Sequence, residues 1–238
     1  MREIFLSIVI PAFNEEEYLP RLIKSIQLQS FPDYEIIIAD GGSEDRTVEI
    51  AESFGCKLVV GGGQNKGRNC GADAANGEYI LFLDADVKLP SSFLQEVISF
   101  VKTRKIQVAS CAAIPLSNNY LDYIMAFLFN IYDYITQFFY PHASGGFCIL
   151  VKKDIHQEIG GFDSGYNLAD YAYPLLASKR GKFRFFWNPK VYISMRRYEK
   201  EGRLKVYGTY ILYEISRIFL GDKRCRFFKY DYKYKENK

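Results

Sequence analysis

An apolar run that ends in two carboxylates constrains the fold more than any other part of this sequence. Residues 79–83 are all apolar or aromatic, and Asp84 and Asp86 follow them with Ala85 in between. A short strand with apolar side chains at every position is typical of a parallel sheet covered on both faces. Alternate residues of an extended segment point the same way, so we expect Asp84 and Asp86 to share one side. Such a pair suits a divalent cation bound to a phosphate, and a solvated turn is the alternative.

Strand and helix signals alternate through the first half of the chain. The expected strands are 6–10 (stopped by Pro11), 35–39, 57–60 and 79–83. The expected helices run from Asn14, as N-cap, to Gln29, from Ser43 to about Phe54, and over 66–76. This alternation predicts an α/β fold with a Rossmann-like, mostly parallel central sheet flanked by helices. Ligands of such sheets bind beyond the carboxyl ends of the strands, where Pro11–Glu15, Asp40 and Asp84–Asp86 would gather.

Composition narrows the class of protein. The chain has 238 residues, 48% of them hydrophobic and 25% charged, as in an ordinary globular protein. Its five cysteines are odd in number and scattered without a CxxC pair, which favours a reducing compartment over a disulfide scaffold or a zinc site. Neither a signal peptide nor a membrane-spanning stretch is evident. We therefore expect a cytoplasmic protein.

Charge is distributed unevenly along the chain. Residues 196–238 carry 13 Lys and Arg against 6 Asp and Glu, whereas the first 195 residues carry 18 against 22. A basic end on a near-neutral body suggests an anionic surface as partner for that end, and argues against nucleic acid as partner for the whole.

Two segments of the second half have mixed apolar and polar patterns. Residues 120–140 are largely apolar but carry a narrow polar stripe at helical spacing: Asp122, Asn130, Asp133 and Gln137. Core packing is the default interpretation, and a cover over an acceptor cleft or contact with a membrane are the alternatives. Residues 203–220 predict an amphipathic helix, and 223–235 interleave cations with aromatic side chains. That pattern suits an anionic headgroup layer, so attachment to the inner face of the cell membrane is a hypothesis for this end.

Ordered motifs resemble a known family. They are Ser7-Ile-Val-Ile-Pro-Ala-Phe-Asn-Glu15, residues 35–47, 66–71, 77–86, 144–147, 160–163, 167–170 and 194–202. Together they resemble family 2 glycosyltransferases with the GT-A fold over roughly residues 5–205. The resemblance implies a GT-A domain at 1–205, with a nucleotide-sugar-binding half at 1–90 and an acceptor half at 91–205. A helical, basic appendage would follow at 206–238.

The resemblance also implies a reaction and a donor site. The expected activity is inverting, metal-dependent transfer of a sugar from a UDP- or GDP-sugar to an acceptor hydroxyl or phosphate, with a glycan or lipid-linked molecule as acceptor. The implied donor-binding residues are Pro11, Ala12, Phe13 and Glu15 at the base and ribose, Asp40 at the base, Gly67 and Arg68, and Asp84 with Ala85. Asp86 would ligate Mg²⁺ or Mn²⁺, with Asp84 in support. A solvated position on a helix surface is the alternative for Arg68.

In the acceptor half, the resemblance matches Asp170 to the general base. Ala169 stands where the family usually has Glu, and an N-cap is the alternative role of Asp170. Arg196 and Arg197 would contact a diphosphate or anionic acceptor, or form a solvated basic turn. Two other functions stay open. One is a catalytically inactive nucleotide-binding or partner subunit, which Ala169 permits; the other, less favoured, is a nucleotidyltransferase, because no Gly-rich loop follows the first strand.

Overall fold

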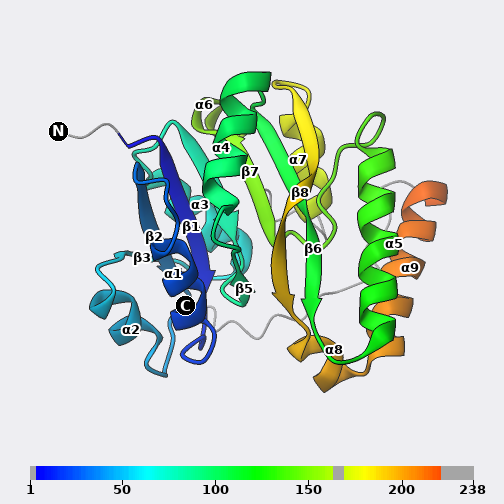
Figure 1. Ribbon diagram of the computed structural model, residues 1–238, viewed down its shortest axis with the longest axis horizontal. Coiled ribbons are helices and arrows are strands. Elements are labelled where there is room, and N and C mark those ends of the chain that lie inside the picture. The colour runs from blue at the N-terminus through cyan, green and yellow to red at the C-terminus, as the bar shows by residue number, and fades with distance from the viewer. Residues whose placement is uncertain (1–3, 163–168, 221–238) are drawn as a thin grey trace.

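A twisted, mostly parallel sheet is the centre of the molecule. The computed structural model describes residues 4–162 and 169–220 (Figure 1). Eight strands form the sheet in the order β3-β2-β1-β4-β7-β6-β8-β5. The strands are β1 (Leu6–Ala12), β2 (Tyr34–Asp40), β3 (Lys57–Val60), β4 (Tyr79–Leu83), β5 (Val87–Lys88), β6 (Val108–Leu116), β7 (Cys148–Lys152) and β8 (Phe183–Ser194). The helices are α1 (Leu19–Gln27), α2 (Thr47–Ser53), α3 (Gln64–Asp73), α4 (Phe93–Arg104), α5 (Tyr120–Thr136), α6 (Lys153–Glu158), α7 (Ala169–Ala177), α8 (Arg196–Glu201) and α9 (Arg203–Leu220).

Strand direction determines which loops meet. β1 pairs in parallel with β2 and β4, and β2 with β3. β7 runs antiparallel between β4 and β6, and β8 is parallel to β6. The carboxyl ends of β1, β2, β3, β4, β6 and β8 therefore lie on one edge of the sheet, the lower edge in Figure 1. The predicted α/β class with a mostly parallel sheet and flanking helices is confirmed.

Helices cover both faces of the sheet, which is why β1 and β4 are apolar at every position. On one face, Leu22 of α1 and Phe93 of α4 join a core with Ile8 and Leu81. On the other face, Ala72 of α3 and residues of α6 and α7 pack with Phe82 and its neighbours. Both faces of β4 are thus buried, and the residues that follow it emerge at the carboxyl edge.

Several element boundaries differ from the sequence expectation: α2 and α3 are shifted to Thr47–Ser53 and Gln64–Asp73, and the differences at β1 and α1 bear on the site. β1 continues through Pro11 to Ala12, because these residues still pair with β2. Asn14 does not cap α1, which begins at Leu19 with Pro20 in its first turn. Asn14 instead has a left-handed backbone (φ 55°), a conformation that Asn tolerates better than most residues. Its side chain is used between two loops, as described below.

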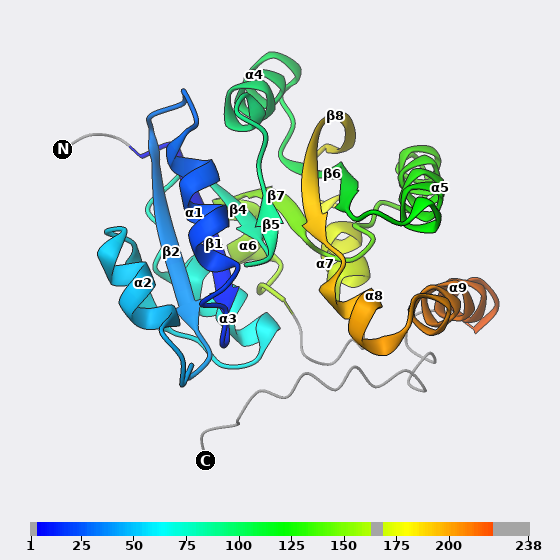
Figure 2. The same cartoon turned by 60° about the horizontal axis from the view of Figure 1, so that its bottom comes forward.

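Helices α5 and α9 lie side by side, and α5 packs against β6 and β8 (Figures 1 and 2). α9 spans the residues predicted to be helical, 203–220, and the predicted domain boundary after 205 falls in its first turn. The division into 1–205 and 206–238 stays a prediction, and the basic segment 223–235 lies outside the described residues. Within the described ranges, every helix is too short or too polar to cross a membrane.

Candidate functional site

Two loops at the carboxyl edge are joined by hydrogen bonds. The Asn14 N–H donates to Ser43 Oγ (2.9 Å), and Asn14 Oδ1 accepts from the Glu44 N–H (2.8 Å). One residue on, the Glu15 N–H donates to Thr47 Oγ1 (2.8 Å). These contacts fix the backbone after β1 against the loop after β2. Sequence reasoning missed this network, since an Asn before an amphipathic segment usually indicates an N-cap.

Asp40 ends β2 beside Ala12 and has one unsatisfied oxygen. Its Oδ2 accepts from the N–H groups of Gly42 (2.9 Å) and Ser43 (3.1 Å). Its Oδ1 is buried and has no hydrogen-bond partner among the described residues. A buried acceptor without a donor costs free energy. An N–H group of a ligand that reached this oxygen would remove that cost.

Two glycines let α3 lie directly on the sheet. A Cβ at Gly71 would stand 2.3 Å from Val9 Cγ1, and one at Gly67 would stand 3.2 Å from Pro11 Cβ. The helix therefore approaches β1 more closely than a larger residue would allow. The predicted donor-binding residue Gly67 packs against Pro11 in this way. This close contact brings the next residue, Arg68, to the carboxyl edge of the sheet.

Arg68 is buried and holds Asp84. Only 1% of its side chain is exposed, so the alternative of a solvated helix surface is wrong. Its Nη2 lies 3.0 Å from Asp84 Oδ1 and donates to the Gly146 carbonyl (2.9 Å), while its guanidinium stacks 5.1 Å from the Phe162 ring centre. Gln64 Nε2 donates to the same Asp84 oxygen (3.1 Å). Two side chains of α3 thus fix the orientation of the Asp84 carboxylate.

Asp86 meets a different partner. The Val87 N–H donates to the Asp84 carbonyl (3.2 Å), so the two carboxylates belong to a turn and not to an extended segment. Asp84 consequently pairs with α3, whereas Asp86 Oδ2 lies 3.0 Å from Arg196 Nε at the start of α8. The expectation that both side chains share one side through strand alternation does not describe this turn.

Arg196 joins Asp86 to Glu15. Its guanidinium donates two hydrogen bonds to the Glu15 carboxylate, one of them 2.8 Å from Nη1 to Oε2, and stacks 4.4 Å from the Tyr18 ring centre. Burial raises the pKa of Glu15 and of Asp86, and Arg196 opposes both shifts. Burial lowers the pKa of Arg196, but Glu15 and Asp86 outweigh it and raise that pKa above its usual high value. One permanently charged guanidinium therefore sits against two carboxylates at the edge.

Arg197 and Arg196 do not act together. Arg197 Nε donates to Glu201 within α8 (2.9 Å), and Nη1 lies 3.5 Å from the Tyr210 hydroxyl of α9. Of the two predicted arginines, the structure brings only Arg196 to the carboxylates. Asp170 lies in the first turn of α7, and its side chain is outside the described part of the chain.

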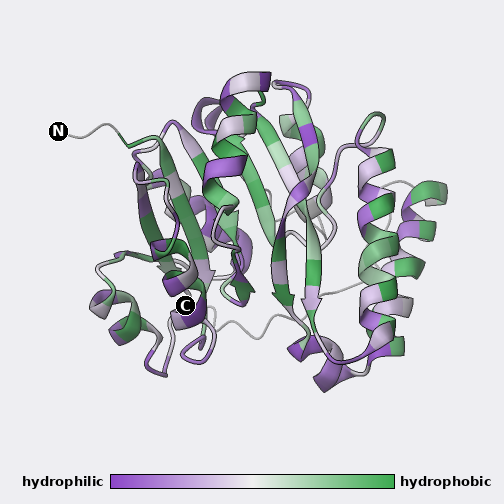
Figure 3. Cartoon of the chain, viewed as in Figure 1, coloured by the Kyte–Doolittle hydropathy of each residue, from purple (hydrophilic) through white to green (hydrophobic). Residues whose placement is uncertain are grey.

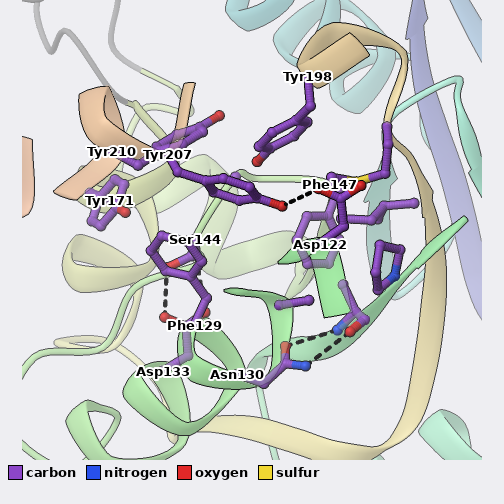
Figure 4. A pocket seen from close by; sticks show the side chains of 16 residues that line it. Asp122, Phe129, Asn130, Asp133, Ser144, Phe147, Tyr171, Tyr198, Tyr207 and Tyr210 are labelled. Carbon is purple, nitrogen blue, oxygen red and sulfur yellow. Dashed lines mark hydrogen bonds between the residues drawn. The ribbon is translucent and has the colours of Figure 1, made fainter. Parts of the chain in front are cut away.

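Several tyrosine side chains line a pocket, which Figure 4 shows from close by. It is a cavity of about 80 Å³ between β6, α5, α7, α8 and α9. Its lining includes Phe129, Ser144, Phe147, Tyr171, Tyr198, Tyr207 and Tyr210. The Phe147 carbonyl accepts the Asp84 N–H (3.2 Å), so one wall of the pocket is continuous with the carboxylate turn. Sequence reasoning did not find this pocket, because its aromatic residues come from four separate segments.

The sheet order and the carboxylate turn at its carboxyl edge define the class of protein as a GT-A-type α/β fold. Solved structures agree. The protein is similar to Staphylococcus aureus TarS 1–349, with a TM-score of 0.65 and 18% identity over 90% of this chain and 64% of that one. It is also similar to the mannosyltransferase PcManGT of Pyrobaculum calidifontis, with a TM-score of 0.64 and 16% identity over 79% of this chain and 56% of that one.

Sequence comparison identifies the family. The family model described as glycosyl transferase family 2 matches residues 7–160. The chain is 31% identical over 105 residues to the poly(ribitol-phosphate) beta-N-acetylglucosaminyltransferase TarS of S. aureus, covering 40% of this chain and 18% of TarS. It is 35% identical over 102 residues to a GalNAc(5)-diNAcBac-PP-undecaprenol beta-1,3-glucosyltransferase of Campylobacter jejuni, covering 39% of this chain and 33% of that enzyme. This chain belongs to glycosyl transferase family 2.

Proposed function

We propose that the protein transfers a sugar from a nucleotide-diphosphate donor to an acceptor, with inversion and with a divalent metal ion. One observation carries the proposal: Asp40, Asp84, Asp86 and Arg196 converge on the carboxyl edge of a family 2 sheet. Structures of TarS hold UDP or UDP-GlcNAc, and that of PcManGT holds GDP-Man with Mn²⁺. These relatives support a UDP- or GDP-sugar as donor here.

The donor base and ribose would lie over the loops after β1 and β2. Pro11, Ala12 and Phe13 lead into the hydrogen-bonded loop pair, which supplies a fixed wall. The buried Oδ1 of Asp40 is an acceptor suited to a base N–H. Glu15, opposite Arg196, would face the ribose.

The carboxylates of Asp84 and Asp86 fit a divalent metal ion. They are hard oxygen ligands, and their side chains are 22% and 24% exposed, so solvent and ligands reach them. Within the described residues no cluster of three or more His, Cys, Asp or Glu side chains could hold a metal ion by itself. Mg²⁺ is commonly bound by one or two carboxylates, and substrate phosphates and water complete its coordination shell. Bound there, Mg²⁺ or Mn²⁺ would neutralise charge on the departing diphosphate.

The protein residues would perform the remaining chemistry. Arg68 holds the Asp84 carboxylate in place through its 3.0 Å pair. Arg196 presents a charged guanidinium at the same edge, where it can bind a diphosphate oxygen. Asp170 would accept the proton of the acceptor hydroxyl as it attacks the anomeric carbon from the face opposite the leaving group.

The acceptor would enter from the side of the tyrosine-lined pocket. Tyrosine rings and buried polar groups suit the apolar and hydroxyl faces of a sugar. TarS is named for poly(ribitol phosphate), and the C. jejuni relative for a PP-undecaprenol glycan. These names support the proposal of a cell-surface or lipid-linked glycan as acceptor.

A thermal-shift screen of nucleotides and nucleotide sugars, with and without Mn²⁺, tests the donor site. A ligand that binds only the folded state raises its melting temperature. We expect UDP or GDP to stabilise the wild type when Mn²⁺ is present, and the shift to disappear in Asp86→Asn. Stabilisation of both proteins alike, with or without metal, would contradict the assignment of Asp86. Donor binding without turnover by the wild type would favour an inactive nucleotide-binding subunit.

A further inference from the structure

Helix α5 buries its polar side and exposes its apolar side. Its buried residues are Asp122, Asn130 and Asp133. Its exposed residues are all apolar or aromatic: Tyr120, Tyr123, Ile124, Phe127, Leu128, Tyr134 and Ile135. An amphipathic helix on a water-soluble protein normally shows the opposite arrangement. The default interpretation of this segment, with the apolar side in the core, is therefore wrong.

Helix α9 shows the inversion in part, because it buries two charged residues along with Val206, Tyr207 and Tyr213. Glu214 and Arg217 are buried between α9 and its neighbours. Apart from Lys205, its exposed residues are apolar: Leu204, Ile211, Leu212, Ile215, Ile218 and Phe219. Figure 3 shows the hydrophobic colour of both helices at the periphery of the molecule. We call the exposed apolar residues of the two helices the α5–α9 face. A contiguous apolar face on adjacent helices marks an interaction site.

Most polar groups behind this face are paired, although Glu214 Oε1 is buried without a hydrogen-bond partner among the described residues. Asp122 accepts from Tyr207 Oη (2.9 Å) and pairs with Arg203 (3.0 Å), which joins α5 to α9. Near the other end, Glu214 accepts from Tyr132 Oη (2.7 Å) and pairs with Arg217 (2.7 Å). Buried charges with specific partners hold the two helices in this orientation. The inversion is therefore a built feature of the fold.

The border of the α5–α9 face carries amphipathic side chains. Trp187 of β8 packs edge-to-face on Phe127 and Tyr134 of α5. Lys190 lies 5.2 Å above the Trp187 ring, and Arg184 lies 5.8 Å above the ring of exposed Phe138. Aromatic rings with adjacent cations suit the headgroup layer of an anionic membrane.

The sequence that follows α9 adds to this charge. Residues 221–238 contain seven Lys and Arg, five aromatic residues and three Asp and Glu. A basic segment that follows an apolar helix in the sequence is attracted to anionic lipid by its charge.

We propose that the α5–α9 face docks on an anionic lipid bilayer, with both helices in the plane of the interface. The helices would insert their outward apolar side chains among the lipids and keep their ion-paired sides against the protein. This docking goes beyond the proposed sugar transfer and does not depend on it. Its consequence for that reaction is that the tyrosine-lined pocket, formed by the inner sides of the same helices, is brought close to the membrane.

Co-sedimentation of the full chain with vesicles tests the docking. One set of vesicles contains phosphatidylglycerol and phosphatidylcholine, and the other only phosphatidylcholine. The test variant combines Ile124→Ser, Phe127→Ser, Ile215→Ser and Phe219→Ser. Its matched control combines Leu28→Ser and Val60→Ser, which are 76% and 85% exposed outside the face. A third protein ends after Asp222, which separates the face from the basic segment.

The wild type and the control should pellet with the anionic vesicles, and the test variant should lose at least about tenfold in partition coefficient. The shortened chain should keep part of its binding. Three results would overturn the proposal. The test variant could pellet like the wild type, or the wild type could stay in solution with both vesicles. Alternatively, sedimentation velocity could show a dimer that only the test variant dissociates, which would assign the face to a second copy. Equal nucleotide-induced thermal shifts in all proteins would show that the donor site is unaffected.

Discussion

Helices α1 and α5 both have an apolar and a polar side, but they orient these sides in opposite ways. In α1, Leu22, Ile23 and Ile26 are fully buried against the sheet, and charged residues such as Lys24 face solvent. In α5 the buried residues are polar, and the apolar ones face outward. Burial of apolar area stabilises the donor half by itself. The α5–α9 pair is instead held by ion pairs and hydrogen bonds, which leaves its apolar area for a partner outside the chain.

Buried polar groups also differ between the two regions. At the carboxyl edge, Asp40 keeps an oxygen without a donor, and Asp86 shares Arg196 with Glu15. Between α5 and α9, Asp122 has partners on both oxygens, whereas Glu214 pairs through Oε2 and has a buried Oε1 without a partner among the described residues. An oxygen without a donor therefore occurs in both regions. The difference is that two carboxylates at the carboxyl edge compete for Arg196, an arrangement that indicates ligand binding.

The largest effect is expected at Asp170, on the helix between the two regions. Asp170→Asn removes the proposed base but keeps the side-chain volume, so transfer should fall by at least about 100-fold while the nucleotide-induced thermal shift is retained. Transfer from a radiolabelled donor to an acceptor extract measures the first quantity. Near-normal transfer would remove Asp170 from the mechanism.

The same substitution on the two helices should have opposite consequences. Ile23→Ser buries a hydroxyl and leaves a cavity in the α1 core, so we expect the free energy of unfolding to fall by about 3–4 kcal/mol. Ile124→Ser on α5 changes an exposed side chain and should alter it by less than about 0.5 kcal/mol. Urea denaturation without lipid measures both. A large loss in Ile124→Ser would mean that α5 packs its apolar side inward.

The sequence predicted the donor half more accurately than the rest for a physical reason. The apolar run 79–83 is a strand buried on both faces, and the structure confirms its bounds and those of the edge strand 57–60. The turn at Asp84–Asp86 and the use of Asn14 between loops depend on partners distant in sequence. The stripe of Asp122, Asn130 and Asp133 was visible, but periodicity gives the spacing of a face and not which side is buried. Only the tertiary partners Arg203 and Tyr207 decide that.

The two histidines should respond to pH in opposite ways. His156 packs with Phe82, Phe162 and Tyr173, and burial lowers its pKa to about 4. Between pH 6.5 and 4 the unfolded chain binds a proton that the folded chain does not, so stability falls with falling pH by about 3 kcal/mol. His156→Phe should remove that loss, as denaturation at several pH values would show.

His142 lies on the other side of the comparison, beside Asp133 of α5 (2.9 Å). Burial lowers its pKa, but the Asp133 carboxylate outweighs burial and raises it. Its contribution to stability is therefore fully present below pH 6.5 and is lost as pH rises through the raised folded value. His142→Gln should flatten this alkaline limb. An unchanged limb would show that the buried imidazole is not charged.

A smaller loss of stability is expected when a buried polar residue of α5 is replaced by an apolar one. Asn130 accepts the Ala113 N–H (3.0 Å) and donates to the Ala113 carbonyl (2.9 Å). Asn130→Leu would leave both backbone groups of β6 buried without partners and should cost about 2 kcal/mol in urea denaturation. The reverse swap at an exposed position, Leu128→Asn, should cost less than about 0.5 kcal/mol. Equal losses of stability from the two substitutions would mean that α5 does not bury its polar side in preference to its apolar side.

The most direct test of the proposed metal and donor site at Asp84–Asp86 is the rate at which nucleoside diphosphate is released from the bound donor. The rate would be measured for wild type and Asp86→Asn, each with Mn²⁺ and with a chelator, using the donor that gives the largest thermal shift. The metal-ligand role predicts turnover by the wild type with Mn²⁺ and at least about 100-fold less under the other three conditions. Equal rates for both proteins, or turnover that survives the chelator, would contradict a metal-assisted donor site at Asp84–Asp86.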